Sequence, residues 1–154
     1  MIKPALQVSL KGRALRLLSQ REHSRSELER KLAAYEQAPG ELAQVLNDLQ
    51  ARDFINEGRV IDSVMHRRSG KLGATRIKQE LASKGLSGEA VTEALAGLRE
   101  TEYSRALEVW RKKFDRPTTD PNDRAKQMRF LLTRGFSSDV VRKIVQGTGD
   151  DEDC

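Results

Sequence analysis

The sequence predicts an all-α fold of three tandem three-helix repeats, each similar to a helix-turn-helix, that stack into an elongated curved array. The first observation is internal similarity: when the 154-residue chain is shifted by 49 residues, its apolar positions coincide without a gap. The second is the helical spacing of those positions, and the third is the lack of any stretch that alternates with period two. A repeat period of this length is typical of stacked supersecondary units.

Two shifts define the repeats. The apolar pairs of the first shift are Leu28 with Ile77, Leu32 with Leu81, Leu42 with Val91, Leu46 with Leu95, Leu49 with Leu98, and Phe54 with Tyr103. A further shift by 50 residues places Lys84-Gly85-Leu86-Ser87 on Arg134-Gly135-Phe136-Ser137, and Val91 and Leu95 on Val141 and Val145. We therefore expect repeats over residues 1–55, 56–102 and 103–147, followed by an acidic tail over residues 148–154.

Each repeat is expected to hold three amphipathic helices. In the first repeat, the three apolar stripes are Leu15 with Leu18, then Leu28 with Leu32, then Leu42, Val45, Leu46 and Leu49. The last stripe has the spacing i, i+3, i+4, i+7 of a helix face. The first helices of the later repeats carry Ile61 with Val64, and Leu107, Trp110 and Phe114.

The helix ends are signalled by local chemistry. Ser24-Arg25-Ser26-Glu27 is a capping box, and Asp120-Pro121 reads as an N-cap followed by proline in the first helical position. Gly85 and Gly135 are expected to end helices in the left-handed conformation, with Leu86 and Phe136 folding back on the last turn. Ser87 and Ser137 should then cap the next helices. Residues 115–122 read as a linker or extended turn, and residues 147–154 as disordered.

Charge indicates the class of partner. The net charge is +5 and the isoelectric point is near 9.6. Asp150, Asp151, Glu152 and Asp153 contribute −4, so the rest of the chain carries +9. A body this basic favours a polyanionic partner, with nucleic acid as the first candidate, although a merely soluble surface remains the alternative.

Membrane and oxidising environments are not indicated. No run approaches the ~20 apolar residues of a membrane span, and residues 1–6 lack the apolar region of a signal peptide. The single cysteine, Cys154, cannot form an internal disulfide. We expect a protein of the reducing cytoplasm.

Nothing in the sequence points to catalysis, a metal or a cofactor. His23 and His66 are far apart, outside any metal-spaced cluster, and no phosphate-binding glycine loop occurs. Paired acids such as Asp120 and Asp123 are better explained as helix caps and first-turn residues. We expect no enzyme activity.

Basic clusters supply the candidate binding residues. Arg67 and Arg68 can be explained as last-turn cations that complement the helix dipole, but Arg76 and Lys78 lie where a helix start should prefer acids. The candidates for contact with a polyanion or an acidic protein surface are Arg67, Arg68, Lys71, Arg76, Lys78, Lys112, Lys113, Arg124, Lys126 and Arg129. A solvated face remains the alternative.

The aromatic residues and the third helices limit how DNA could be bound. Tyr103, Trp110, Phe114 and Phe136 fall on repeat-core positions, so base stacking is not expected and binding should be electrostatic and blind to sequence. The third helix of the second repeat, Glu89 to Leu98, has two acids and no base. Because phosphates would repel such a helix, a groove-reading transcription factor is not expected.

Three motifs resemble those of the bacterial RecX family. Arg21-Glu22-His23-Ser24-Arg25-Ser26-Glu27-Leu28, with Arg30-Lys31-Leu32, is similar to the opening motif. Gly73-Ala74-Thr75-Arg76-Ile77-Lys78-Gln79-Glu80-Leu81, with Lys84-Gly85-Leu86, is similar to the central motif, and Arg129-Phe130-Leu131-Leu132-Thr133-Arg134-Gly135-Phe136 to the last. The resemblance covers roughly residues 12–146. One departure lies at Asn56-Glu57-Gly58-Arg59-Val60, where the family has an acidic pair, an aromatic and an alanine.

The resemblance implies a regulator, mainly an inhibitor, of the RecA recombinase. Family members bind the RecA–single-stranded-DNA filament, block its extension or promote its disassembly, and lower ATP hydrolysis and strand exchange; many also bind single- and double-stranded DNA without sequence preference. The ten basic residues are then the expected contacts with filament or DNA, and a monomer in the bacterial cytoplasm is favoured. The alternative is a non-specific DNA-binding architectural protein.

Overall fold

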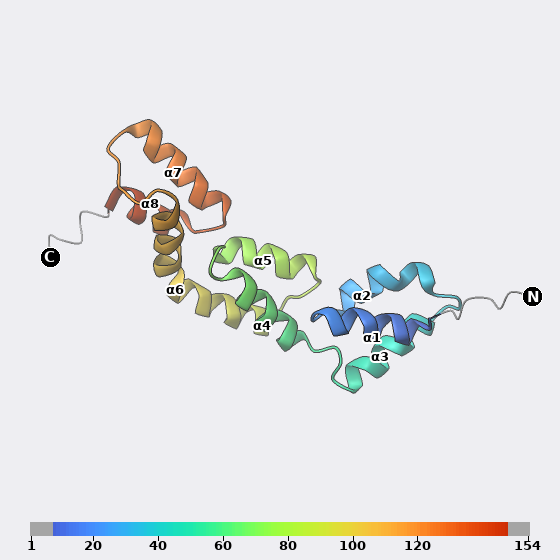
Figure 1. Ribbon diagram of the computed structural model, residues 1–154. Coiled ribbons are helices and arrows are strands. Elements are labelled where there is room, and N and C mark those ends of the chain that lie inside the picture. Colours follow the sequence, from blue (N-terminus) through green and yellow to red (C-terminus); the bar gives the residue numbers. More distant parts are fainter. Residues whose placement is uncertain (1–7, 148–154) are drawn as a thin grey trace, which may run out of the picture. The chain divides into compact units, whose positions relative to one another are not determined.

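The computed structural model describes residues 8–147, and within that range the chain forms helices, turns and loops but no strand. This confirms the all-α prediction. The helices, labelled in Figure 1, are α1 (Leu10–Gln20), α2 (Arg25–Leu32), the 3-10 helix η1 (Ala33–Tyr35), α3 (Glu41–Ala51), α4 (Glu57–Arg68), α5 (Ala74–Ser83), α6 (Glu89–Lys113), α7 (Pro121–Thr133) and α8 (Ser138–Gly147).

The described residues divide into two compact units. Unit 1 consists of residues 8–63 together with 84–86, and unit 2 consists of residues 64–83 and 87–147. The division falls inside α4, and the short segment that follows α5 belongs to unit 1. Each unit is a packed body with its own core.

The core of unit 1 lies among α1, α2 and α3. Leu28, Leu46 and Leu49 are completely buried there. The remaining buried members are Leu10, Ala14, Leu32, Leu42 and Ile55. Burying a leucine side chain stabilises a fold by roughly 1.5–3 kcal/mol, so the stripes expected on α2 and α3 account for much of this packing. Helix α1 instead enters the core through Leu10 and Ala14, and its expected stripe, Leu15 with Leu18, is only partly buried.

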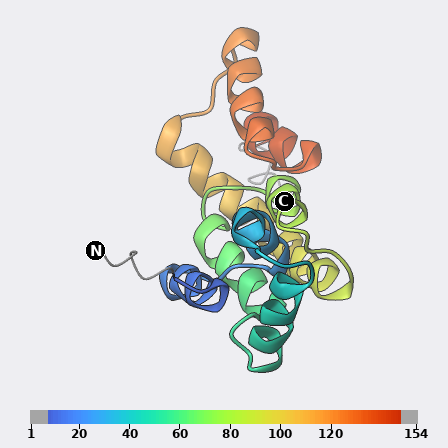
Figure 2. The ribbon, with the colours of Figure 1, turned by 90° about the vertical axis from the view of Figure 1, so that its right-hand side faces the viewer.

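The core of unit 2 lies among α6, α7 and α8, which contact one another. Figures 1 and 2 show these three helices in two views. Trp110 and Phe136 are buried, and Tyr103 and Phe114 pack against the same cluster. The indole Nε1 of Trp110 donates to Gln127 Oε1 at 3.0 Å. The predicted core positions of these four rings are confirmed.

Helix α6 is longer than the sequence analysis expected. The third helix of the second repeat and the first helix of the third form one continuous helix of 25 residues. The segment between them, residues 99–106, contains no glycine or proline that would end a helix. In the first repeat, by contrast, the backbone of Asp53 turns to φ 66° after α3. The expected boundary at residues 102 and 103 therefore lies inside a helix.

Most of the predicted helix ends are confirmed. Ser24 and Glu27 form the capping box, and Asp120 caps α7 with Pro121 in its first turn. Gly135 has φ 89°, and the turn carries the two expected backbone bonds, from Phe136 N to Leu131 O at 3.3 Å and from Gly135 N to Leu132 O at 2.9 Å. Gly85 is likewise left-handed, with φ 75°.

Three local expectations are wrong. Ser87 does not cap α6, because the N-cap residue is Gly88 and that helix start has no side-chain capping hydrogen bond. Phe54 was paired with Tyr103 as a core position, yet it is 45% exposed. Gly147 was assigned to the disordered tail but is the last residue of α8. The rest of that tail, residues 148–154 with Cys154, lies outside the described residues.

Candidate functional site

All ten predicted binding residues lie in unit 2. Arg67 and Arg68 end α4, Lys71 follows it, and Arg76 and Lys78 lie in the first turns of α5. Lys112 and Lys113 end α6, whereas Arg124, Lys126 and Arg129 belong to α7. The structure thus gathers the ten into one compact unit but spreads them over four helices and a turn.

Six of the ten are exposed and have no ion pair or hydrogen bond from their side chains within the described part of the chain. They are Arg67, Lys71, Lys78, Lys112, Lys126 and Arg129. Because no carboxylate of residues 8–147 pairs with any of these six side chains, each is available to an anionic partner. Such charges attract phosphates or acidic protein surfaces over about one Debye length, roughly 8 Å at physiological salt.

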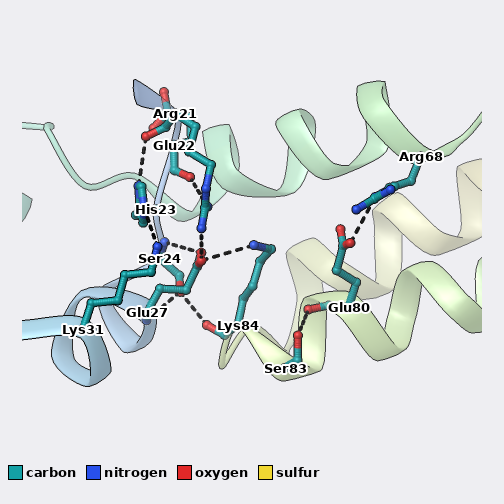
Figure 3. Close-up of polar contacts among 10 residues, drawn as sticks. All are labelled: Arg21, Glu22, His23, Ser24, Glu27, Lys31, Arg68, Glu80, Ser83 and Lys84. Atoms are coloured by element: carbon teal, nitrogen blue, oxygen red, sulfur yellow. Dashed lines mark hydrogen bonds and ion pairs between the residues drawn. The ribbon is translucent and has the colours of Figure 1, made fainter. Parts of the chain in front are cut away.

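The other four have partners inside the protein. Arg68 pairs with Glu80 at 3.1 Å (Figure 3), and Arg124 Nε donates to Thr118 O at 2.8 Å. Lys113 Nζ lies 5.8 Å from the centre of the Phe130 ring. Arg76 Nη1 donates to Thr133 O at 2.9 Å, which satisfies a carbonyl at the end of α7. Arg76 and Arg124 therefore have structural roles that the dipole argument missed.

Arg76 is part of a joint between the start of α5 and the end of α7. Gly73 N donates to Arg134 O at 2.8 Å, and Thr75 N donates to Gly135 O at 3.3 Å. A Cβ atom added to Gly73 would collide with the carbonyl of Gly135. Only glycine allows the two backbones to approach this closely.

Glu102 holds the same joint from α6. This carboxylate is buried, and it accepts from Ala74 N at 2.7 Å and from Ser137 N at 3.2 Å. It therefore satisfies free amide groups at the starts of α5 and α8 together. One turn further on, Arg105 donates to the carbonyls of Ser69, Leu72 and Leu98; burial lowers the pKa of this guanidinium, and the charge of Glu102 opposes that change.

Unit 1 contains an equivalent joint, drawn in Figure 3. Ser24 Oγ donates to Lys84 O at 2.6 Å, and a Cβ atom on Gly85 would stand 2.7 Å from Ser26 Cβ. The sequence shift by 49 residues places Ser24 on Gly73, and the shift by 50 places Gly85 on Gly135. The repeat similarity thus extends to the way a helix start meets a glycine turn.

Glu27 is the charged centre of this joint. Its carboxylate is buried and accepts from Arg21 at 2.7 Å, from Ser24 N at 3.1 Å and from Lys84 at 3.3 Å. Burial by itself raises the pKa of the carboxyl, but the hydrogen bonds and charges of these partners outweigh it and lower the pKa to about 2. Glu27 therefore stays ionised at every physiological pH.

His23 is a structural residue. Its ring is buried, with Nδ1 3.0 Å from Arg21 O and Nε2 3.2 Å from Lys31 Nζ. Since an ammonium group can only donate, Nε2 accepts and Nδ1 carries the proton. Burial lowers the pKa of this imidazole. His66 is exposed in the last turn of α4, and within residues 8–147 no group of three or more ligand-type side chains could hold a metal.

Exposed rings were missed by the sequence analysis. Tyr35 is 48% exposed, and the guanidinium carbon of Arg13 lies 3.8 Å from its ring centre. Phe54 borders a hollow of about 370 Å³ with Leu15 and Leu18. The signal for Tyr35 was its position, because the repeats place Lys84 and Arg134 there. Since stacking on such rings tolerates any base, it adds no sequence preference.

No helix among the described residues has the length and apolar character needed to cross a bilayer.

Comparison with known proteins identifies relatives that match nearly the whole chain. Models of the first, second and third three-helix domains of RecX match residues 11–49, 56–95 and 100–145. The "Regulatory protein RecX" of Leptothrix cholodnii is 54% identical over 140 residues, covering 91% of this chain and 89% of the relative. That of Herminiimonas arsenicoxydans is 47% identical, covering 96% and 98%.

Solved structures agree in fold. The crystal structure of RecX from Lactobacillus salivarius superposes with a TM-score of 0.73 at 24% identity, covering 89% of this chain and 92% of that one. At this identity the likeness shows the fold alone, whereas the three matched domains and the sequence relatives show descent. The chain belongs to the RecX family.

Proposed function

We propose that this protein regulates the RecA recombinase, mainly as an inhibitor. It binds the RecA–single-stranded-DNA filament in its groove and blocks extension or promotes disassembly, which lowers ATP hydrolysis and strand exchange. The observation that carries the proposal is the match to all three RecX domains, in order, over nearly the whole chain. The protein acts by binding, as a monomer in the bacterial cytoplasm, and not by catalysis.

The six unpaired cations of unit 2 support this role physically. A nucleoprotein filament presents phosphates and acidic side chains at a regular repeat. Contacts from several helices of one compact unit then add, because the first contact raises the effective concentration of the others. Reversing such charges lowers the association rate and adds repulsion. Arg76 and Arg124 serve this surface mainly by holding its helices in place.

The test is ATP hydrolysis by RecA on single-stranded DNA, titrated with this protein. Half-inhibition at a protein concentration well below the concentration of DNA binding sites supports action on the filament, because one bound molecule then affects many recombinase subunits.

The second candidate is a non-specific architectural DNA-binding protein, favoured by the same unpaired cations. It predicts inhibition only at concentrations that coat the DNA. Binding to free DNA would weaken steeply with salt under both hypotheses, since counterions are released from the phosphates, so stoichiometry separates the two.

A further inference from the structure

Tyr35 is an exposed ring beside a cation in unit 1. It ends η1, which contacts α2, and it is 48% exposed. The guanidinium carbon of Arg13, from α1, lies 3.8 Å from the ring centre. At this distance the guanidinium lies over the face of the ring, because the ring hydrogens keep an in-plane neighbour further away. One face therefore contacts Arg13, and much of the rest of the ring is open to solvent.

The Arg13 guanidinium has no other partner among the described residues, since its side chain forms no ion pair and no hydrogen bond there. The acids that follow Tyr35 in the sequence are directed elsewhere: Glu36 and Glu41 accept hydrogen bonds from backbone amides of the loop and of α3. Arg13 thus offers planar N–H donors next to an open ring. Such donors suit the oxygens of a phosphate.

Packing does not explain the ring. Every residue from 33 to 40 is exposed, and Tyr35 does not belong to the buried core of unit 1. The sequence shifts place Lys84 and Arg134 at this position, and both of those side chains have partners inside the protein. An open aromatic side chain at this position is therefore a feature of the first repeat alone.

The charge around the pair favours nucleic acid. Residues 10–35 carry seven basic and three acidic side chains, a net charge of +4. Proteins that bind single strands combine exposed rings, on which bases stack, with cations that follow the backbone. Unstacked bases also stack on guanidinium planes, so Arg13 enlarges the surface that Tyr35 offers. An acidic peptide would be attracted by the cations, but it has no flat group for the ring.

We propose that Tyr35 and Arg13 form a nucleobase-binding site on unit 1. One base of a single DNA strand stacks on the Tyr35 ring, and a backbone phosphate of that strand accepts from Arg13. The site uses none of the ten cations of unit 2 and adds a base-dependent contact to theirs. That the strand is DNA rests on the proposed function. The test contains no recombinase, so its failure leaves the regulation of RecA untouched.

The affinity test compares two labelled strands that carry the same phosphates, oligothymidine and an abasic oligomer of equal length. Fluorescence anisotropy, recorded as the full chain is added, gives both dissociation constants. Tyr35→Leu should weaken binding to oligothymidine about fivefold to tenfold, the lower range for one stacked base, and leave binding to the abasic oligomer unchanged. Tyr35→Phe keeps the ring and should bind both strands as the wild type does.

Phe54→Leu is the matched control. Phe54 is a similarly exposed ring of unit 1, at 45%, but it borders the hollow with Leu15 and Leu18. Its replacement should leave both dissociation constants unchanged. The melting temperature of Tyr35→Leu should stay close to that of the wild type, because the side chain lies outside the core, so a loss of affinity is not a loss of folding.

A cross-link locates the base. A 5-iodouracil in place of one thymine couples to an adjacent aromatic side chain on irradiation. Trypsin then releases residues 32–52 as one peptide, in which Tyr35 is the only aromatic residue, whereas Phe54 lies on the next peptide, residues 53–59. The first peptide should carry the cross-link in the wild type and lose it in Tyr35→Leu.

Three results would overturn the proposal. The first is an equal loss of affinity for both strands in Tyr35→Leu, which would show that the bases have no role. The second is an unchanged affinity of Tyr35→Leu for oligothymidine, or a cross-link that lies outside residues 32–52. The third is polyglutamate that loses affinity for Tyr35→Leu by the same factor as oligothymidine, which would assign the pair to an acidic peptide.

Discussion

Gly73 and Gly135 meet backbone to backbone at the joint between α5 and α7, with no room for a Cβ atom on Gly73. The amide of Gly73 donates to Arg134 O at 2.8 Å, and Thr75 N donates to Gly135 O at 3.3 Å. The contact joins residues about sixty positions apart, and it sets the helices that carry Lys78, Lys126 and Arg129.

Gly73→Ala is expected to destabilise unit 2 by roughly 1–3 kcal/mol, because the added methyl group overpacks a backbone contact. Thermal denaturation followed by circular dichroism measures the change. The matched control is Gly97→Ala in α6, where a Cβ atom would meet nothing within 4 Å and helix propensity should stabilise by up to ~1 kcal/mol. Equal melting temperatures for Gly73→Ala and the wild type would contradict the close backbone contact between Gly73 and Gly135.

Glu102→Gln should destabilise the protein by roughly 1–3 kcal/mol, because an amide cannot accept from Ala74 N and Ser137 N with both terminal atoms. Urea denaturation checks this. Glu100→Gln is the control, since Glu100 is exposed on the same helix; its effect should stay within about 0.5 kcal/mol. If both variants unfold at the same urea concentration, Glu102 does not hold the two helix starts.

Acid should weaken the joint of unit 1 through Glu27. Its pKa is lowered from 4.5 to about 2 in the folded protein, so the stabilisation is complete above pH 4.5 and is lost as the pH falls from 4.5 towards 2. The lowered pKa of His23 acts in the same direction, starting below pH 6.5. The difference in the free energy of unfolding between the wild type and Glu27→Gln, measured by urea denaturation, isolates the contribution of the carboxylate. This difference should shrink between pH 5 and pH 2. A difference that stays constant over this range would contradict the lowered pKa of Glu27.

Stability separates the cations with structural roles from those available to partners. Lys78→Glu combined with Lys126→Glu should leave the melting temperature nearly unchanged, because neither side chain has a partner among the described residues. Arg76→Glu should lower it, since the bond to Thr133 O is lost and a carboxylate there repels the same carbonyl. An equal loss in both proteins would mean that Lys78 and Lys126 are also structural.

Local chemistry in the sequence predicted most of the fold. The glycine turns at Gly85 and Gly135 and the caps at Ser24 and Asp120 depend on residues within a few positions of each other, so a pattern reveals them. The fused helix α6 could have been predicted from the lack of a stop signal between residues 98 and 107. The N-cap at Gly88 could not have been predicted, because no side-chain capping hydrogen bond marks that helix start.

The site was predicted less completely, for a physical reason. Glu102 bonds to residues 28 and 35 positions away, and Arg76 bonds to a carbonyl 57 positions away. Such partners become visible only after the helices pack. The dipole rule therefore identified Arg76 as unusual but attributed it to an external partner, whereas Lys78 and Lys126 have no partner within residues 8–147.

The central claim is that unpaired cations of unit 2 dock this protein on a RecA filament. The most direct measurement is RecA ATP hydrolysis on single-stranded DNA, titrated with the wild type and with Lys78→Glu/Lys126→Glu. Arg16→Glu is the control, because Arg16 is an exposed cation of α1 in unit 1. The account predicts that the wild type reaches half-inhibition at a protein concentration far below the concentration of DNA binding sites. Arg16→Glu should need the same concentration. The double variant should need roughly a tenfold higher concentration, equivalent to about 1.4 kcal/mol. Identical curves for all three proteins, with folding intact, would contradict it.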